Sequence, residues 1–374
     1  MDSSLIKISG ILDVNQKGFG FIRKKGVFYR ESQDDTFVPA EFIRRKWLRS
    51  GIYIEGEGVY GKEGNLILKK IISLNNKQTE IYRVPKPYHK LTTISPNQRI
   101  KLETEDGPLS TRVIDLLSPI GKGSRSLIIA PPKVGKTTIL KDIANGCSIS
   151  NPDISIYVLL IDERPEEVTD MVRSIKGQVL ASSMDQDLIN HTRLCRLTLE
   201  IAKRKVEMGE DVLILLDSIT RMSRAFNNTE GDSGRSLSGG LDSRAMIFPR
   251  SFFGAARNIE YGGSLTIIGT ALVDTGSKMD ELIFREFQGT GNQEVVLSRR
   301  LSNKRVFPAI DIERTRTRKE ELLLTKDQLL ASTRIRRGLF NLNNTNAMER
   351  LIETMKQHDT NDKFIQVLLD AIRE

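Results

Sequence analysis

The stretch S-L-I-I-A-P-P-K-V-G-K-T, residues 126–137, sets the plan of the whole chain. It begins with a largely apolar run typical of a buried strand, and a turn and a helical pattern follow. From Ala130 onward it matches the phosphate-binding loop GxxxxGK[ST] at every fixed position except the first, where alanine replaces glycine. In such a loop Gly135 permits close backbone approach, Lys136 reaches the β and γ phosphates, and Thr137 offers its hydroxyl to Mg²⁺. We therefore expect a nucleoside triphosphate to bind between a strand and a helix.

The residues around this loop bear on that interpretation. Pro131 and Pro132 have no amide hydrogen, so the amides that cradle the phosphates must begin at Lys133. The N-terminus of the following helix adds amide donors and a favourable dipole. A chance match to the loop pattern is the alternative, and the strand before the loop and the helix after it argue against that.

From Arg99 onward, apolar strands alternate with helical segments. The strands are expected at residues 126–130, 156–162, 212–217, 264–272 and 292–298. The helix after the phosphate loop is predicted to end at Gly146, another helix should begin near Pro165, and the C-terminal segment also has a helical pattern. Fully apolar strands separated by helices predict a parallel sheet covered on both faces.

Two of these strands end in acidic residues, which phosphoryl transfer requires for metal binding and for orienting water. Asp217 ends V-L-I-L-L-D and would hold Mg²⁺ through water, while Asp162 and Glu163 end the preceding strand. Glu163 is the candidate for polarising the attacking water, with Arg164 beside it. The alternative is that these acids cap the helices that follow them. Two acidic strand ends together with the phosphate loop favour the catalytic interpretation.

The first 75 residues have another pattern, because glycines separate short strand-like runs. These runs are K-I-S-G-I-L-D-V, G-F-G-F-I-R, T-F-V-P-A-E-F, I-Y-I-E-G-E-G-V-Y-G and N-L-I-L-K-K-I-I-S-L. They predict a small β-barrel over residues 1–75. Residues 76–98 are polar, contain three prolines and are predicted to be a linker to a second domain, residues 99–374.

Within the first domain, K-G-F-G-F-I-R places Lys17, Phe19, Phe21 and Arg23 on one face of a strand. A protein core accepts the phenylalanines but not their charged neighbours. A single-stranded nucleic acid accepts both, because bases stack on aromatic rings and phosphates pair with cations. Burial of the phenylalanines in the core is the alternative.

Composition sets the broad class of the protein. The chain has 374 residues, of which 39% are hydrophobic and 28% charged, as in an ordinary globular protein of two or three domains. Its net charge of +9 favours a polyanionic partner. We expect a cytoplasmic protein without a membrane segment or secretory signal, since no apolar run of about 18 residues is present. Cys147 and Cys195 are predicted to be buried, reduced thiols.

The segment K-R-V-F-P-A-I-D-I-E-R-T-R-T-R-K-E-E, residues 304–321, is rich in arginine. A solvated surface is one interpretation. In a ring of ATPases, an arginine that enters the neighbour's site would instead stabilise transition-state charge. Phe307 is either a core residue or a platform for adenine. These residues alone leave both alternatives open.

Several long segments resemble those of the Rho family of transcription termination factors. They are A-P-P-K-V-G-K-T, L-L-I-D-E-R-P-E-E-V-T-D-M, L-L-D-S-I-T-R-M-S-R-A-F-N, F-F-G-A-A-R-N, L-V-D-T-G-S-K-M-D-E-L-I-F-R-E-F-Q-G-T-G-N and K-R-V-F-P-A-I-D, together with G-F-G-F-I-R. The resemblance runs in order through nearly the whole chain. It implies an α/β, RecA-like P-loop ATPase core with an N-terminal OB-fold barrel of the cold-shock type. RecA itself and the rotary ATPases resemble only the core.

The resemblance also implies roles for individual residues in ATP hydrolysis. Glu163 would be the catalytic acid, Asp217 the second acid of the site, Arg318 the arginine finger and Arg305 a second interface arginine. Phe307 would stack on adenine, and Thr137 and Asp217 would hold Mg²⁺. The implied ATP contacts are Gly121, Lys122, Gly123, Ser124, Arg125, Ser126, Lys133, Val134, Gly135, Lys136, Thr137, Thr138, Arg164 and Phe307.

For RNA, the resemblance implies two sets of contacts. The primary site on the barrel, which prefers pyrimidines and cytosine especially, comprises Phe19, Phe21, Arg23, Asp35 and, as a weaker candidate, Glu63. The loops lining a central pore comprise Leu237, Ser238, Gly239, Gly240 and Lys278. The chain departs from the family in three places. The helical subdomain that usually precedes the barrel is expected to be missing, Asn65 stands where an aromatic is usual, and Arg235 and Ser236 replace lysine and valine.

The leading hypothesis is a homohexameric, RNA-dependent ATPase. It would capture nascent, C-rich single-stranded RNA, move along it 5′ to 3′ and dislodge RNA polymerase. A DNA-directed motor of the RecA type is one alternative, and the 2′-hydroxyl of RNA would discriminate between them. A nucleic-acid-binding module that only switches with nucleotide is another. Intact Lys136, Glu163, Asp217 and Arg318 argue against this last hypothesis.

Overall fold

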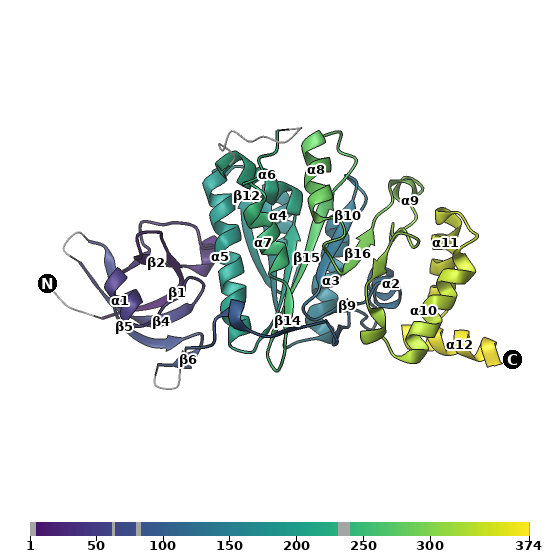
Figure 1. The fold of residues 1–374 in the computed structure, drawn as a ribbon, viewed down its shortest axis with the longest axis horizontal. Coiled ribbons are helices and arrows are strands. Elements are labelled where there is room, and N and C mark those ends of the chain that lie inside the picture. Colours follow the sequence, from purple (N-terminus) through teal and green to yellow (C-terminus); the bar gives the residue numbers. More distant parts are fainter. Residues whose placement is uncertain (1–4, 62–63, 80–83, 231–239, 374) are drawn as a thin grey trace.

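The computed structural model describes residues 5–61, 64–79, 84–230 and 240–373, which form two parts (Figure 1). A small β-barrel at the N-terminus lies beside a larger α/β domain, and the C-terminal helices lie at the end of that domain farthest from the barrel. In the described residues, no helix combines the length and the apolar character that spanning a lipid bilayer would need.

Five short strands close into the N-terminal barrel. Their bounds are β1, Ile6–Val14; β2, Gly20–Arg23; β3, Thr36–Val38; β4, Tyr53–Tyr60; and β5, Leu66–Leu74. They pair antiparallel in the order β3-β2-β1-β4-β5, and β3 also pairs in parallel with β5 at Phe37 and Ile67, which closes the sheet. Leu12, Ile22 and Ile54 are among the apolar side chains that fill its interior. The barrel expected from the glycine-punctuated runs is confirmed.

The predicted strand T-F-V-P-A-E-F is only half correct. Strand β3 stops at Val38, and a short helix, α1, Ala40–Arg45, begins directly after Pro39. Proline suits this position, because its fixed φ is compatible with a helix start and the first amides of a helix need no internal partner. A single apolar run therefore supplies both a barrel strand and a surface helix.

After the barrel, the chain passes through β6, Lys77–Gln78, and then runs along the α/β domain. In the turn η2, Tyr88–Lys90, the Tyr88 hydroxyl donates a hydrogen bond to the Ala255 carbonyl at 2.7 Å. Strand β7, Thr93–Ile94, then pairs with β14, Arg257–Ile259. The described part of the predicted linker is thus packed against the second domain from Tyr88 onward.

A mainly parallel sheet forms the centre of the second domain, in the order β12-β11-β13-β15-β10-β16-β17. All these neighbours are parallel except β17, which is antiparallel to β16 at the edge. The bounds are β10, Arg125–Ala130; β11, Ser155–Glu163; β12, Gln178–Ser183; β13, Asp211–Asp217; β15, Ser264–Leu272; β16, Gln293–Val296; and β17, Arg316–Thr317. The parallel sheet and the five strands expected from the apolar runs are confirmed, whereas the edge strands β12 and β17 were not predicted.

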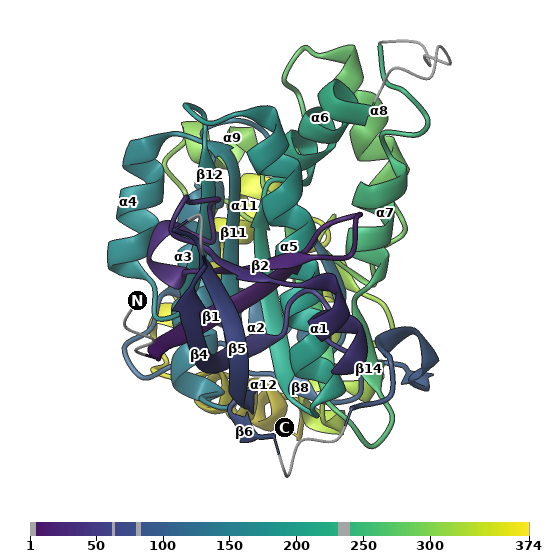
Figure 2. The ribbon, with the colours of Figure 1, turned by 90° about the vertical axis from the view of Figure 1, so that its left-hand side faces the viewer.

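Helices cover both faces of this sheet, as Figure 2 shows. On one face lie α3, Lys136–Ser150, and α4, Pro165–Ser174. On the other lie α5, Leu188–Glu207; α6, Ile219–Glu230; α7, Ile247–Gly254; and α8, Lys278–Phe287. The two hydrophobic clusters that these helices form with the sheet are separate, which is the arrangement expected for parallel strands buried on both sides.

Gly146 does not end α3, contrary to the expectation from sequence. The helix continues to Ser150, and Gly146 lies at a close approach of two backbone segments. A Cβ atom at this position would lie 2.3 Å from the Leu102 carbonyl oxygen. The glycine is therefore required by packing rather than by helix termination.

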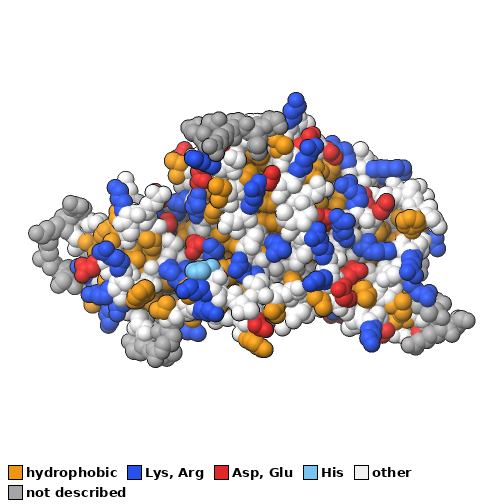
Figure 3. Space-filling view, viewed as in Figure 1, with side chains coloured by type: hydrophobic (Ala, Val, Ile, Leu, Met, Phe, Trp, Pro, Cys, Tyr) orange, Lys and Arg blue, Asp and Glu red, His pale blue; other side chains and the backbone are white. Residues whose placement is uncertain are grey.

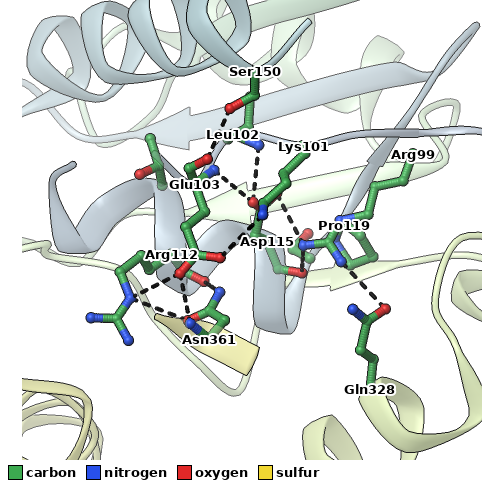
Figure 4. Close-up of polar contacts among 12 residues, drawn as sticks. Arg99, Lys101, Leu102, Glu103, Arg112, Asp115, Pro119, Ser150, Gln328 and Asn361 are labelled. Atoms are coloured by element: carbon green, nitrogen blue, oxygen red, sulfur yellow. Dashed lines mark hydrogen bonds and ion pairs between the residues drawn. The ribbon is translucent and has the colours of Figure 1, made fainter. Parts of the chain in front are cut away.

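Three helices close the C-terminus: α10, Lys326–Leu339; α11, Asn344–Lys356; and α12, Asn361–Arg373. A buried polar network joins them to the start of the α/β domain (Figure 4). Asp115 accepts the amides of Leu102 and Glu103 at 2.9 and 2.8 Å, and Glu103 accepts the amide of Asn361 at 2.6 Å. The first residue of α12 is thereby tied to the N-terminal edge of the domain.

Candidate functional site

The phosphate-loop residues lie between the end of β10 and the start of α3. Ala130 ends the strand, and Lys136 is the first residue of the helix. Gly135 immediately before it has a φ of 90°, in the left-handed region that glycine adopts at little cost. This conformation aims the N-terminus of α3, with its free amides, at the position of a phosphate group.

Lys136 lies against the two acids that were predicted to act with it. Its Nζ donates to Asp217 Oδ1 and lies 3.6 Å from Glu163 Oε1. Glu163 and Asp217 are only 3% and 1% exposed. Thr270 on β15 also donates its hydroxyl to Asp217 Oδ1, at 2.8 Å. Adjacent parallel strands thus bring their C-terminal acids to the lysine of the phosphate loop.

A β-bulge decides which acid of β11 faces the site. The pairing with β12 shifts its register between Ile161 and Glu163, and Asp162 between them has a φ of 56°. The extra residue reverses the alternation of side chains at the strand end. Glu163 therefore points inward, while Asp162 is partly exposed. The sequence analysis named Glu163 as the acid that polarises water, but it did not predict the bulge that turns this side chain inward.

Burial and neighbouring charges set the ionisation of Glu163. Burial raises the pKa of its carboxyl group, and the nearby Asp217 carboxylate raises it further. Lys136 and Arg221 act in the opposite direction, and Arg221 Nη1 lies 3.2 Å from Glu163 Oε2. Sequence reasoning missed Arg221 and Thr270. The signal for Arg221 was its place one helical turn after Asp217, in D-S-I-T-R.

The residues after β16 also approach the phosphate loop. In α9, Arg299–Asn303, the Ser302 hydroxyl donates to the Lys133 carbonyl at 3.4 Å. Phe307 is 47% exposed, and a Cβ atom added to Gly135 would lie 4.0 Å from the Phe307 ring. Arg305 and Arg164 are both exposed on this side of the domain. Phe307 is thus a surface residue beside the loop, and not part of the core.

A second set of predicted ATP residues lies at the opposite end of β10. Arg125 and Ser126 are the first two residues of the strand; Gly121 to Ser124 precede it, whereas the phosphate loop follows it. Six strand residues at ~3.3 Å each separate the two by about 20 Å. Arg318 lies with the turn, and both line one cavity of about 380 Å³. Within one chain, the structure therefore brings neither the turn nor Arg318 to the phosphate loop.

The residues proposed for Mg²⁺ could bind that ion only together with the phosphates of a nucleotide, as in other phosphate loops. No group of three or more histidine, cysteine or acidic side chains suited to a metal occurs among the described residues. Mg²⁺ commonly takes one or two protein ligands and fills its remaining positions with phosphate and water. Thr137 follows Lys136 directly, and Asp217 lies against that lysine, so both would border a bound triphosphate.

On the barrel, Phe19 and Phe21 point outward and a third phenylalanine joins them. The ring centroids of Phe19, Phe21 and Phe37 lie 5.5 to 5.8 Å apart. The first two are partly exposed, whereas Ile22 between Phe21 and Arg23 fills the core. The core interpretation of the phenylalanines is therefore disfavoured. Sequence reasoning missed Phe37, although it faces Phe21 directly across the strand pair.

Arg23 lies beside this aromatic cluster but is held by acids. It donates to Asp35 at 2.6 Å, to Glu31 at 2.9 Å and to Asp13 at 3.2 Å, and its guanidinium lies 5.0 Å from the Phe21 ring centroid. The other oxygen of Asp35, Oδ1, is buried without a hydrogen-bond partner. Glu63 lies outside the described residues.

The two segments predicted to line a pore meet at α8. A Cβ on Gly240 would lie 3.6 Å from the methyl group of Met279, and Lys278 is exposed at the first position of that helix. Leu237, Ser238 and Gly239, with Arg235 and Ser236, lie outside the described residues. Arg224 on α6 fixes α8 through a two-bond contact with Asp280, at 2.8 and 2.7 Å.

Comparison with known proteins identifies the class. Residues 110–316 match the nucleotide-binding domain of the ATP synthase alpha/beta family, and residues 8–80 match the RNA-binding domain of the Rho termination factor. A solved ATPase from a bacterial type III secretion system shares the fold, with a TM-score of 0.62 and 21% identity, over 82% of this chain and 94% of that one. The chain is thus a P-loop ATPase, an ATP-hydrolysing enzyme, with an attached RNA-binding domain.

Two curated relatives settle the family. The chain is 48% identical to the transcription termination factor Rho of Haemophilus influenzae over 96% of its own length and 87% of that protein. It is 49% identical to Rho of Streptomyces lividans over 97% of its length, but spans only 52% of that longer protein. The chain belongs to the Rho family of transcription termination factors, as its motifs predicted.

Proposed function

We propose that this protein is a transcription termination factor that uses ATP hydrolysis to move along nascent RNA and release it from RNA polymerase. One observation carries the enzymatic part of the proposal: Lys136 lies between Glu163 and Asp217 at the phosphate loop. This is the minimum set that holds a γ-phosphate, orients water and binds a metal ion. Placement in the cytoplasm, where RNA polymerase acts, is part of the proposal.

Hydrolysis would begin when ATP phosphates attract Lys136 away from the two carboxylates. Glu163, once ionised and freed from the lysine, accepts a hydrogen bond from a water and takes its proton as the water oxygen attacks the γ-phosphorus. The bond to the ADP oxygen breaks, and Lys136 and the amides of α3 neutralise the charge on the phosphate oxygens. Mg²⁺, held by Thr137 and through water by Asp217, would supply further charge neutralisation.

The position of Arg318 is best explained by a ring of identical chains. Arg318 and the residues Gly121 to Ser124 lie about 20 Å from the phosphate loop of their own chain, at the spacing of a six-residue strand. In a closed ring, the same face of one chain would meet the phosphate loop of the next. Arg318 and Arg305 would then stabilise the transition state across a subunit interface. A homohexamer, as the family resemblance implies, is proposed.

The barrel is the proposed point of capture for single-stranded RNA. The partly exposed triangle of Phe19, Phe21 and Phe37 offers stacking surfaces for bases. The Oδ1 of Asp35 has no hydrogen-bond partner among the described residues but is buried, so it would accept the exocyclic amine of cytosine, and so favour C-rich RNA, only once a stacking base has uncovered it. Basic side chains are spread over both domains on the face in Figure 3, in keeping with the net charge of +9.

Movement is proposed to involve the segments near α8. Gly240 lies against Met279, the neighbour of Lys278 in α8, and the fixed α8 would carry a displacement of the ATPase core to the phosphate that Lys278 contacts. The segment Leu237 to Gly240 would complete the pore.

The decisive experiment compares ATP hydrolysis by the purified protein alone, with poly(C), with poly(U), and with single-stranded DNA of equal length. Stimulation by RNA, greatest with poly(C), is expected. Equal stimulation by the two RNAs would support the RNA-driven motor but contradict the proposed preference for cytosine. Stimulation by DNA alone would favour a DNA-directed motor, and nucleotide binding without stimulated turnover would favour a switch.

A further inference from the structure

Trp47, the single tryptophan of the chain, lies fully on the barrel surface in an unfavourable conformation. It is 76% exposed, and its φ is 53°. Residues with a Cβ rarely adopt this left-handed region, and bulky ones least of all. An indole that is both exposed to water and held in a disfavoured backbone conformation contributes little to folding.

The end of α1 imposes this conformation. The Trp47 amide donates to the Arg44 carbonyl at 3.2 Å, and the Leu48 amide donates to the Ile43 carbonyl at 3.0 Å. This pattern terminates a helix with one left-handed residue, a position at which glycine or asparagine is usual. Leu48 then turns into the barrel core, so Trp47 projects outward.

Three consecutive cationic residues immediately precede Trp47 in the chain. Arg44, Arg45 and Lys46 are all exposed, and none of them forms an ion pair within the described part of the chain. Arg45 lies over the Phe42 ring, 5.4 Å from its centroid. Three cationic side chains without acidic partners leave their charge available to a ligand. Beside an exposed aromatic ring, they favour a polyanion that carries flat bases.

This surface continues the aromatic cluster already described. Helix α1 begins two residues after β3, which carries Phe37, and its first residue, Ala40, lies within 3.9 Å of the Cβ position of Gly18, next to Phe19. Trp47 lies seven residues further on, about 10 Å along the helix direction. Figure 2 shows α1 beside the barrel strands.

We propose that Trp47, with Arg44, Arg45 and Lys46, forms an additional stacking site for single-stranded RNA, beyond the phenylalanine triangle. This inference rests on the proposed RNA-directed function. One strand would pass from the phenylalanines across α1, with a base on the indole and its phosphates on the three cations.

The tryptophan itself reports on this contact. Because the chain has one tryptophan, the emission of the full-length protein at indole wavelengths arises from Trp47 alone. Titration with oligocytidylate should quench that emission, with a midpoint equal to the RNA concentration that half-stimulates ATP hydrolysis. Unchanged emission at saturating RNA would overturn the proposal.

Trp47→Asn separates binding from folding, because asparagine suits the left-handed position. The melting temperature should stay equal or rise, while the RNA dissociation constant should increase about 5- to 100-fold, the range for a lost stacked base. Trp47→Phe should retain most of the affinity. The matched control is Tyr261→Asn, since Tyr261 is likewise an exposed aromatic residue with a positive φ, 55°, but belongs to the ATPase domain. It should leave RNA affinity unchanged.

The outcomes distinguish this proposal from the function on which it rests. RNA that stimulates ATP hydrolysis equally in the wild type and in Trp47→Asn would overturn only the Trp47 site. RNA that neither binds nor stimulates the wild-type protein would overturn both. Loss of oligomers by Trp47→Asn in sedimentation, with RNA affinity intact, would assign the indole to a contact between chains and so reject the RNA site.

Discussion

Arg193 of the ATPase domain donates a hydrogen bond to Asp13 of the barrel at 3.1 Å, through the same carboxylate oxygen that accepts Arg23 at 3.2 Å. Arg193 also donates to the Tyr29 carbonyl at 2.6 Å. One residue of α5 therefore fastens the barrel at two points, and one of these points holds the arginine beside the aromatic cluster.

Replacing this arginine should loosen the barrel without affecting the chemistry. Arg193→Met removes charged hydrogen bonds at a partly buried contact, which typically costs about 1–3 kcal/mol. We expect faster amide exchange in β1 and β2 and faster cleavage of the segment between the domains by a dilute protease. ATP turnover without RNA should stay at the wild-type rate. Unaltered exchange in the barrel strands would show that other contacts hold the domains together.

Lys136→Ala should reduce ATP hydrolysis by about 100- to 1,000-fold, the cost of losing a donor to transition-state charge. The control is Lys141→Ala, five residues later on α3, where the lysine pairs with Asp170 on the surface. Steady-state phosphate release measures both. If the two variants hydrolyse ATP at equal rates, the assignment of the phosphate loop is wrong.

The pH dependence of turnover should reflect Glu163. Its raised pKa means that the carboxylate needed to accept a proton is lost on acidification at a higher pH than for an ordinary glutamate, whose pKa is 4.5. The acid limb of the kcat profile should therefore lie above that value. Arg221→Met removes a charge that lowers the pKa of Glu163, so the limb should move to still higher pH. A limb that stays in place would assign it to another group.

The two cysteines should be inert while the protein is folded. Burial raises the pKa of the Cys147 thiol to about 12 and also raises that of Cys195, and both are free thiols inside helices. Because alkylation requires the thiolate, iodoacetamide at pH 8 should modify neither in the native protein and both in denaturant. Mass spectrometry counts the modified cysteines. Labelling of either thiol in the native protein would contradict the prediction and show that the helix carrying it opens locally.

Local patterns made much of the molecule predictable. The strand-loop-helix around Lys136 and the acids at the ends of β11 and β13 follow from short-range sequence, because parallel strands align their carboxyl ends. The closed barrel, the covered sheet and the buried thiols were also predicted correctly.

Other features depend on contacts between distant segments, which short-range patterns do not encode. Gly146 looked like a helix end, yet the Leu102 backbone lies against it inside a continuous helix. The inward turn of Glu163 depends on a bulge, and the bond between Arg193 and Asp13 joins residues 180 positions apart. The family resemblance grouped Gly121 to Ser126 with the phosphate loop, although the strand expected at residues 126–130 already lay between most of them. Only the fold reveals that Arg318 lies beside these residues, at the amino end of β10.

Through that strand, β10, each subunit would contact two nucleotides, one at each end. If chains assemble head to tail, the carboxyl end of β10 senses the subunit's own ATP, and the amino end, with Arg318, senses that of its neighbour. Six residues of extended backbone in the middle of a sheet bend very little. Strand β10, about 20 Å long, would then be the shortest mechanical connection between consecutive active sites. The order in which these sites hydrolyse ATP would therefore depend on the stiffness of the sheet.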